Sequence, residues 1–274
     1  MVERNPHRRR HYDRSLIPFL IPGSTIILVT ILALGTLTVI QINDIERFLR
    51  IAGDHAVLHA LFLTIFAGMC AVMILSLIGT PLAYYLARTK SRFRGIIESI
   101  VDIPLILPHT VAGILVYLLF MREGLIGAPM SAVGIIFEEA FPGIVAAMTF
   151  VSAPFYVNAV REGFEKVPVH LENAARTLGA THSYAFVTIT LPLATREIVN
   201  GALLAWGRSI GEFAAVIIIA YYPMVISTLI YYRFTTGGIA EAQGLAFLMI
   251  VICFGIFLLV RSVTRFLGRY DDRV

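Results

Sequence analysis

Residues 167–192 read VPVHLENAARTLGATHSYAFVTITLP and form the longest polar interval in a very apolar chain. Within it, the segment 172–179 (ENAARTLG) is rich in strong helix formers and ends in Gly179, which predicts a short helix that stops at the glycine. Pro168 before this helix and Pro192 after it separate it from the apolar stretches on either side. A short helix held between two long apolar segments is suited to contact another protein.

The rest of the chain has the composition of a membrane protein. It is 58% hydrophobic and 15% charged, with a mean hydropathy of +0.81, unlike an average soluble domain. Crossing about 30 Å of hydrocarbon takes about 20 helical residues, and lipid offers no hydrogen-bond partners to an open sheet edge. We therefore predict an all-α integral membrane protein with six transmembrane helices, at residues 16–40, 57–87, 98–120, 141–160, 198–220 and 244–266.

Basic residues are unevenly distributed between the connections. Most of the Lys and Arg residues lie in four segments, 1–15, 88–94, 161–197 and 261–273. The connections between them hold few, namely Arg47, Arg50, Arg122 and Arg233. The positive-inside rule then places both termini and the 161–197 loop in the cytoplasm of a multi-pass protein of the cell membrane. The tail 1–15 is expected to rest near anionic lipid headgroups, and a pI of 9.2 needs no nucleic acid as a partner.

The polar interval resembles the EAA signature of ABC importer permeases. Six positions match at fixed spacing, namely Ala174, Ala175, Gly179, Ile189, Leu191 and Pro192. The sequence departs from the signature at its first position, which is Asn173, and the nearest acid is Glu172, one residue upstream. The alternative interpretation is a linker helix without a partner.

This resemblance implies a fold, a role and partners. It implies a type I ABC importer transmembrane domain over residues 57–266, with a cytoplasmic coupling helix in the loop 161–197. The chain would act as a homodimer with two cytoplasmic ABC ATPase subunits and one external substrate-binding protein. ATP would be bound by the ATPase, so that this chain needs no cofactor of its own. The implied ATPase-coupling residues are Glu172, Asn173, Ala174, Ala175, Arg176, Gly179, Leu191 and Pro192.

Polar residues inside the predicted spans are candidates for a translocation path. Arg208 and Glu212 are four residues apart on one helix face, about 15 Å from the cytoplasmic end at 1.5 Å per residue. Ionisable residues at such depth are functional candidates by default, and Pro104 and Pro108 predict a bend with freed backbone groups nearby. The candidate path residues are Asp102, Pro108, His109, Thr110, Arg208, Ser209 and Glu212. For the charged pair and for the bend, a purely packing role remains the alternative.

Three further segments resemble oxyanion permeases. Residues 107–114 (LPHTVAGI), 207–216 (GRSIGEFAAV) and 220–235 (AYYPMVISTLIYYRFT) are similar to the molybdate, tungstate and sulfate members of the ABC permeases. The last segment is most similar to the molybdate and tungstate branch, which implies one of these two substrates. The alternatives are a sulfate or thiosulfate permease, or an ion-coupled carrier that works without an ATPase.

The sequence also argues against a membrane enzyme. Its two lysines, Lys90 and Lys166, lie outside any G-x-x-x-x-G-K-[ST] loop, and HExxH does not occur. No convincing nucleophile–base pair is evident in the sequence either. We expect no catalytic site, no metal site and no ATP site on this chain.

Overall fold

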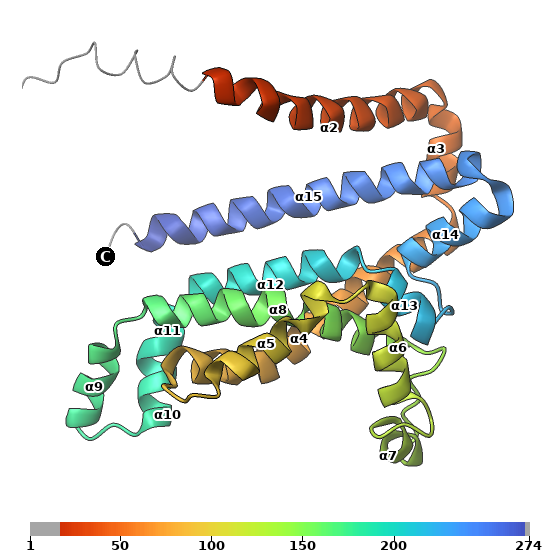
Figure 1. Cartoon of the computed structure of the whole chain (residues 1–274). Helices are drawn as coiled ribbons and strands as arrows, with labels where there is room; N and C mark the ends of the chain where they lie inside the picture. Colours follow the sequence, from red (N-terminus) through yellow and green to blue (C-terminus); the bar gives the residue numbers. More distant parts are fainter. Residues whose placement is uncertain (1–16, 272–274) are drawn as a thin grey trace, which may run out of the picture. The chain divides into compact units, whose positions relative to one another are not determined.

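The computed structural model describes residues 17–271, and the regular elements there are all helices, as predicted. The predicted basic tail 1–15 and the first residue of the predicted span 16–40 lie outside the described residues. The chain divides after Ala52 into two compact units, which are considered separately below (Figure 1).

The first unit consists of a long apolar helix and a short amphipathic one. Helix α2 runs over Ile17–Asn43, and α3 over Ile45–Ala52. The part of α2 from Pro22 to Asn43 has a mean hydropathy of 2.3 and is long enough to cross a membrane. This agrees with the first predicted span, although the helix continues beyond residue 40.

Three long helices of the second unit coincide with predicted spans. Helices α4 (His55–Arg88), α8 (Phe141–Lys166) and α15 (Ile239–Asp271) cover the second, fourth and sixth predictions. Each contains a segment long and apolar enough to cross a membrane. The carboxylate of Asp54 caps α4 by accepting a hydrogen bond from the N–H of Ala56 at 2.9 Å.

The third predicted span, 98–120, is broken into two helices at the predicted bend. It consists of α5 (Arg94–Ile106) and α6 (His109–Phe120), whose axes differ by 115°. The cause is Pro108, because a proline disfavours helical backbone in the residue before it, and Leu107 is extended at φ −68° and ψ 139°. Pro104, in contrast, lies inside α5 and does not end it.

The fifth predicted span, 198–220, is also interrupted. Helix α12 (Thr195–Ile210) ends at Gly211, and a short helix α13 (Ala214–Ile219) follows. The carboxylate of Glu212 accepts a hydrogen bond from the N–H of Ala215 at 2.9 Å, which supports this new helix start. By length and hydropathy, four described helices can cross a membrane alone, or five if α5 and α6 count as one span. The predicted fifth span was therefore wrong as one helix, whereas the third is broken where Pro108 predicts a bend.

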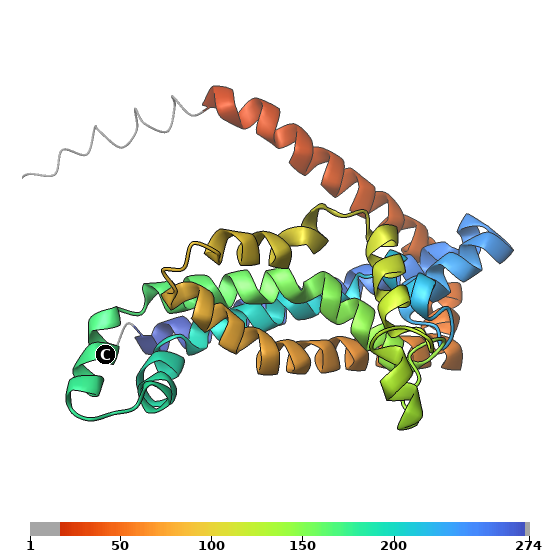
Figure 2. The same cartoon turned by 60° about the horizontal axis from the view of Figure 1, so that its bottom comes forward.

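Helices α4, α8 and α12 form the centre of the second unit, and Figures 1 and 2 show α8 and α12 side by side. Helix α4 approaches α12 closely at Gly68, where an added Cβ would lie 3.0 Å from the side chain of Trp206. It also contacts α8, where the hydroxyls of Thr80 and Tyr156 share a buried hydrogen bond of 2.8 Å. Small residues and satisfied hydroxyls at helix contacts are typical of packing within membranes.

Short helices complete the second unit. Helix α7 (Gly127–Ala132) follows α6, and α14 (Ile226–Gly237) precedes α15. The loop between α8 and α12 contains α9 (Val169–Thr177), α10 (His182–Ala185), the π-helical turn η1 (Phe186–Thr190) and α11 (Leu191–Leu193). In Figure 1 this loop lies at one end of the bundle, away from α7.

Candidate functional sites: a helical loop and a buried ionic cluster

Helix α9 occupies the place where the sequence predicts a short helix. It begins after Pro168 and ends in a Schellman motif, in which the N–H of Ala180 bonds to Ala175 O and that of Gly179 to Arg176 O, both at 3.0 Å. Gly179 has a φ of +95°, a conformation that residues with a Cβ rarely adopt. The glycine is therefore required by the way this helix ends.

Glu172 is buried inside the molecule, although it belongs to an otherwise exposed helix. Its side chain is 5% exposed. The Oε1 atom accepts hydrogen bonds from Arg88 Nε at 3.0 Å, from Arg88 Nη2 at 2.7 Å and from Thr190 Oγ1 at 2.8 Å. The Oε2 atom accepts one from the hydroxyl of Tyr84 at 3.0 Å. The acid that stands one residue upstream of the EAA-like position thus contacts this chain itself.

These contacts determine the charge state of Glu172. Burial by itself would raise the pKa of its carboxyl group, but the hydrogen bonds from Arg88, Thr190 and Tyr84 and the charge of Arg88 outweigh burial and lower that pKa. The carboxylate is therefore ionised and paired. Removing only Arg88 would leave the buried carboxylate without its counter-charge, at a cost of about 3–5 kcal/mol.

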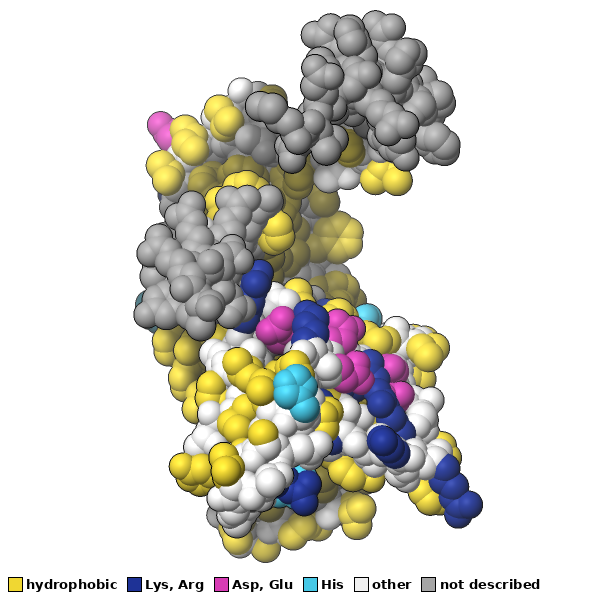
Figure 3. All heavy atoms as spheres, turned by 90° about the vertical axis from the view of Figure 1, so that its left-hand side faces the viewer, with side chains coloured by type: hydrophobic (Ala, Val, Ile, Leu, Met, Phe, Trp, Pro, Cys, Tyr) yellow, Lys and Arg dark blue, Asp and Glu magenta, His cyan; other side chains and the backbone are white. Residues whose placement is uncertain are grey.

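The exposed side of the loop carries most of the other predicted coupling residues. Asn173, Ala174 and Arg176 are exposed, and Ala175 is half-buried. Beside them, a groove of about 510 Å³ lies between α9 and α10, and Leu178 on its wall is 89% exposed. Its lining residues are Ala175, Leu178, Gly179, Ala180, Thr181 and Tyr184. Figure 3 shows the end of the molecule with this loop, where acidic and basic side chains gather next to apolar ones.

Leu191 and Pro192, the last two residues of the EAA-like pattern, lie in α11. Leu191 packs against the core beside α4 and α8, and Pro192 is exposed in the first turn of α11. Leu191 thus attaches the loop to the hydrophobic core of the second unit.

Sequence reasoning missed three residues of this site, namely Tyr84, Arg88 and Thr190. Arg88 is 84 positions from Glu172, so no local spacing connects the two. Tyr84 further contacts Phe186, at 4.6 Å between ring centroids, and Phe164, at 5.6 Å. The one signal available was that a basic residue ends the predicted second span on the side of the loop.

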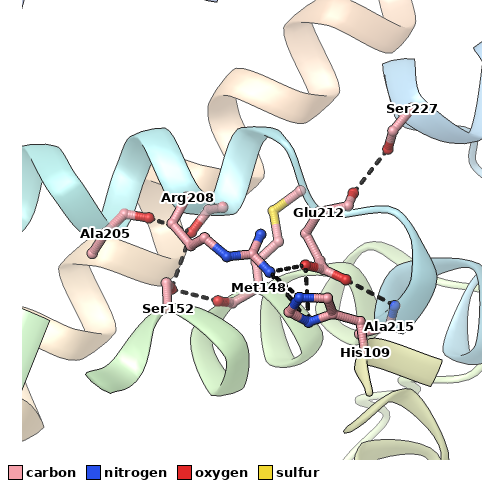
Figure 4. Close-up of polar contacts among 9 residues, drawn as sticks. His109, Met148, Ser152, Ala205, Arg208, Glu212, Ala215 and Ser227 are labelled. Atoms are coloured by element: carbon pink, nitrogen blue, oxygen red, sulfur yellow. Dashed lines mark hydrogen bonds and ion pairs between the residues drawn. The ribbon is translucent and has the colours of Figure 1, made fainter. Parts of the chain in front are cut away.

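The second site is an ionic cluster where α6 and α12 meet (Figure 4). Arg208 Nη2 donates to Glu212 Oε2 at 2.7 Å and lies 3.0 Å from His109 Nε2. His109 Nδ1 is 3.8 Å from the same carboxylate oxygen. The structure thus joins His109 to the pair that the sequence predicts, because the break at Pro108 turns the start of α6 toward the end of α12.

Glu212 holds the cluster in place. Its side chain is 2% exposed, and one carboxylate oxygen binds Arg208 while the other accepts the N–H of Ala215. Its backbone carbonyl accepts a hydrogen bond from the hydroxyl of Ser227 at 2.8 Å. His109 is much more accessible, since 45% of its side chain is exposed. The cluster therefore consists of a fixed carboxylate, a guanidinium and an accessible imidazole.

The other predicted path residues have different partners. Asp102 on α5 accepts a hydrogen bond from Asn158 on α8 at 2.7 Å. Ser209 donates to Ser152 at 3.1 Å, within the contact between α12 and α8. Pro108 immediately precedes α6, and Thr110 is exposed in the first turn of that helix. His109, Arg208 and Glu212 thus contact one another, whereas Asp102 and Ser209 pair with α8.

Comparison with known proteins places this chain in a family. A model described as "Binding-protein-dependent transport system inner membrane component" matches residues 79–270, well over half of the chain. The molybdate/tungstate transport system permease protein WtpB of Thermococcus kodakarensis is 34% identical over 249 residues, which cover 91% of this chain and 96% of the relative. The sulfate transport system permease protein CysW of Synechococcus elongatus is 29% identical over 212 residues, covering 76% of this chain and 74% of the relative.

A solved structure shares the fold. A chain in the crystal structure of a bacterial ABC transporter that imports the acidic polysaccharide alginate superimposes with a TM-score of 0.71. The match covers 94% of this chain and 98% of the other at 19% sequence identity. The second unit described here is thus built like a known importer subunit in its helical architecture.

Proposed function

Because this chain belongs to the family of binding-protein-dependent transport system inner membrane components, we propose that it is the permease subunit of an ATP-driven importer of molybdate or tungstate. It is a membrane transport subunit and not an enzyme. We take residues 57–266 as the transporter domain, a range that overlaps the family match to residues 79–270. The α9 loop and the ionic cluster are the two features of the chain that carry the proposal.

The proposed assembly is a homodimer that binds two cytoplasmic ABC ATPase subunits and one external substrate-binding protein. One chain offers a single α9 loop, so two ATPase subunits require two chains. The basic residues of the segments 88–94 and 161–197 support a cytoplasmic position for this loop and for both termini. Light scattering of the purified complex measures the stoichiometry, and a stable complex with one permease chain would contradict it.

Helix α9 is the proposed docking element for the ATPase. It presents Asn173, Ala174 and Arg176 outward, and the adjoining groove has an exposed apolar wall at Leu178. An apolar groove with few charges suits a docking surface, because burying it on binding costs little desolvation. Glu172 enters this proposal as an internal support and not as a contact residue, because it is buried.

A charge placed on this surface tests the docking proposal. Ala175→Asp introduces a carboxylate into the groove between α9 and α10, where it would be desolvated on binding. We expect weaker binding of the ATPase subunit and loss of transport-linked ATP hydrolysis, with normal membrane insertion. The matched control is Ala132→Asp, an exposed alanine on α7, which should bind the ATPase like wild type. Equal binding by Ala175→Asp would show that α9 is not the contact.

The ionic cluster is the proposed polar element of the path. A dianion that crosses a low-dielectric region needs a counter-charge or a wet path. Arg208 supplies the positive charge, and the negative charge of Glu212 leaves the region close to neutral. The dianion is therefore released and not retained there. His109 is the accessible partner of the guanidinium. Pro108 and Thr110 shape the start of α6, and Asp102 and Ser209 hold α5 and α12 against α8.

Removing the guanidinium tests this role. Arg208→Ala should reduce uptake while the protein still inserts and still binds its ATPase. Arg92→Ala, at an exposed position, serves as the control for loss of one positive charge. Wild-type uptake by a normally folded Arg208→Ala variant would limit Arg208 to a packing role.

Molybdate or tungstate is proposed ahead of sulfate and thiosulfate. The support is the sequence identity of the relatives, which is 34% for the molybdate/tungstate permease of Thermococcus kodakarensis and 29–30% for two sulfate permeases. The test is uptake into vesicles that contain the permease, its ATPase and its binding protein, with each oxyanion competing against the others. Sulfate displacing both metallates at equal concentration would contradict the assignment.

A further inference from the structure

Helix α9 has a stiff connection to a helix that is distant from it in sequence. Glu172 of α9 is bound by Tyr84 and Arg88, which lie in the last turns of α4. It is also bound by Thr190, the last residue of η1. A buried carboxylate with four hydrogen bonds, two of them from one guanidinium, has a fixed geometry. We call these four residues the Glu172 network.

The covalent connections of α9 are less stiff. Between α8 and α9, Val167 and Pro168 are both extended, with ψ of 119° and 124°, and Pro168 has no N–H to continue a helical hydrogen-bond ladder. After α9, Gly179 has a positive φ. Residues at the ends of an element are typical hinge positions. Because helical hydrogen bonds do not continue from α8 into α9, these two connections are the points at which α9 can turn relative to α8 and α12.

Arg88 blocks this movement at the first hinge. Its Nη2 atom donates to Glu172 at 2.7 Å and also to the carbonyl oxygen of Val167 at 3.0 Å. One guanidinium thus joins the end of α4, the hinge residue after α8 and the middle of α9. Its side chain is largely buried, so that water does not compete strongly for these bonds.

Helix α4 is in a position to pass movement on. It packs along α8 and contacts α12, the helix that carries Arg208. At the other end of α4, Asp54 forms an ion pair with Arg233 of α14. A displacement applied to the Arg88 end of α4 would therefore reach the helices around the ionic cluster as well as the opposite end of the bundle.

We propose that Arg88 and Glu172 are positioning residues that make α9 and the end of α4 move as one body, so that movement of the ATPase reaches the path through α4. The inference rests on the proposed docking of α9 to the ATPase. In this proposal, movement is transmitted through the contact between Arg88 and Glu172, which are 84 positions apart in the sequence. The chain connections on either side of α9 do not transmit it.

The test separates transmission from docking. Arg88→Met and Glu172→Gln each weaken the Glu172 network but leave the exposed face of α9 unchanged. For each reconstituted complex, three quantities are measured: the affinity for the ATPase subunit, the rate of ATP hydrolysis and the number of oxyanions imported per ATP. Hydrogen exchange of the amides in residues 169–178 reports whether α9 has come loose. Arg94→Met is the matched control, because it breaks an ion pair with Glu98 within α5 and one with Glu165 between α5 and α8, and neither involves α9.

We expect both variants to bind the ATPase like wild type, to exchange α9 amides faster and to import roughly tenfold fewer oxyanions per ATP, a typical size for a coupling between sites. Arg88→Lys should recover part of the loss, since an ammonium can reach Glu172 but lacks the fork that also holds Val167. Arg94→Met should behave like wild type. Should Arg88→Met fail to fold, Glu172→Gln and Arg88→Lys still carry the test.

Two results would overturn the inference. Unchanged import per ATP in both variants would show that α9 moves the path by another route. Loss of ATPase binding in these variants would assign the network to docking and not to transmission. Failure of the docking proposal itself is recognised separately, because Ala175→Asp would then bind the ATPase normally.

Discussion

Gly179 shows how one residue fixes the end of a functional helix. Its φ of +95° lies in a region where side chains with a Cβ cost about 1–2 kcal/mol. An added Cβ would meet no other atom within 4 Å, so the cost of a substitution is conformational and not steric. We expect Gly179→Val to loosen the end of α9 and to impair transport while the rest of the protein stays folded. Hydrogen exchange of residues 174–180 measures the effect.

A matched substitution separates conformation from side-chain size. Asn tolerates the left-handed region much better than a β-branched residue does, so Gly179→Asn should retain most of the transport activity. Equal losses in Gly179→Asn and Gly179→Val would mean that an exposed side chain at this position blocks a contact, whatever its backbone preference.

Glu172 predicts a specific dependence on pH. The pKa of its carboxyl group is below the ordinary value of 4.5, because the hydrogen bonds and the charge of Arg88 outweigh burial. A lowered folded-state pKa adds stability above the unfolded-state value, and this stability is lost as the pH falls through the folded-state pKa. The difference in unfolding free energy between wild type and Glu172→Gln should therefore be constant near neutral pH and shrink below pH 4.5. Thermal unfolding at a series of pH values measures it, and a constant difference down to acidic pH would contradict the pairing.

At the residue scale, the sequence predicts conformation better than contacts. The left-handed glycine follows from a helix pattern and its stop signal, which are local. The partner of Glu172 does not follow from a local pattern, because Arg88 belongs to another helix. Only the packing of α4 against the loop brings Arg88 close to Glu172. For the same reason, the sequence predicts the Arg208–Glu212 pair, four residues apart, but not its contact with His109.

At the scale of elements, the apolar segments predict the helices well but not their interruptions. Both interrupted spans contain polar residues of the ionic cluster, His109 in the third and Arg208 and Glu212 in the fifth. Hydropathy averages over such a stretch and cannot distinguish one helix from two. Pro108 indicates a bend, but the 115° between α5 and α6 depends on what α6 packs against.

That packing partner is α13, and Gly113 is the point of closest approach. An added Cβ at Gly113 would lie 2.9 Å from the Cα atom of Ala215, so the two helices would have to separate. We expect Gly113→Ala to destabilise the protein by about 1–3 kcal/mol, as overpacking usually does, and to weaken the contact between His109 and Arg208. The unfolding temperature in detergent and oxyanion uptake measure the two effects.

Gly95 offers the control for Gly113. It lies in α5, where an added Cβ meets no atom within 4 Å. Gly95→Ala should be neutral or stabilising by up to about 1 kcal/mol, since alanine favours helix. Similar destabilisation by both substitutions would contradict the close contact between α6 and α13.

At the scale of the whole molecule, the second unit connects two functional regions through its long helices. The loop with α9 lies between α8 and α12, and α12 ends at the ionic cluster. Helix α4 packs against α8 and α12 and is bound to α9 by the Glu172 network. Membership in the family explains the architecture, and in our proposal the Glu172 network transmits movement of the α9 loop to the helix bundle.

We propose that this chain imports an oxyanion only when an ATPase drives it. The direct measurement is uptake of labelled molybdate into sealed vesicles that contain the chain with its ATPase, with ATP enclosed and the binding protein outside. We predict uptake that requires both the ATPase and hydrolysable ATP, and that stops in Ala175→Asp. Equal uptake by vesicles that lack the ATPase would contradict the claim and indicate an ion-coupled carrier.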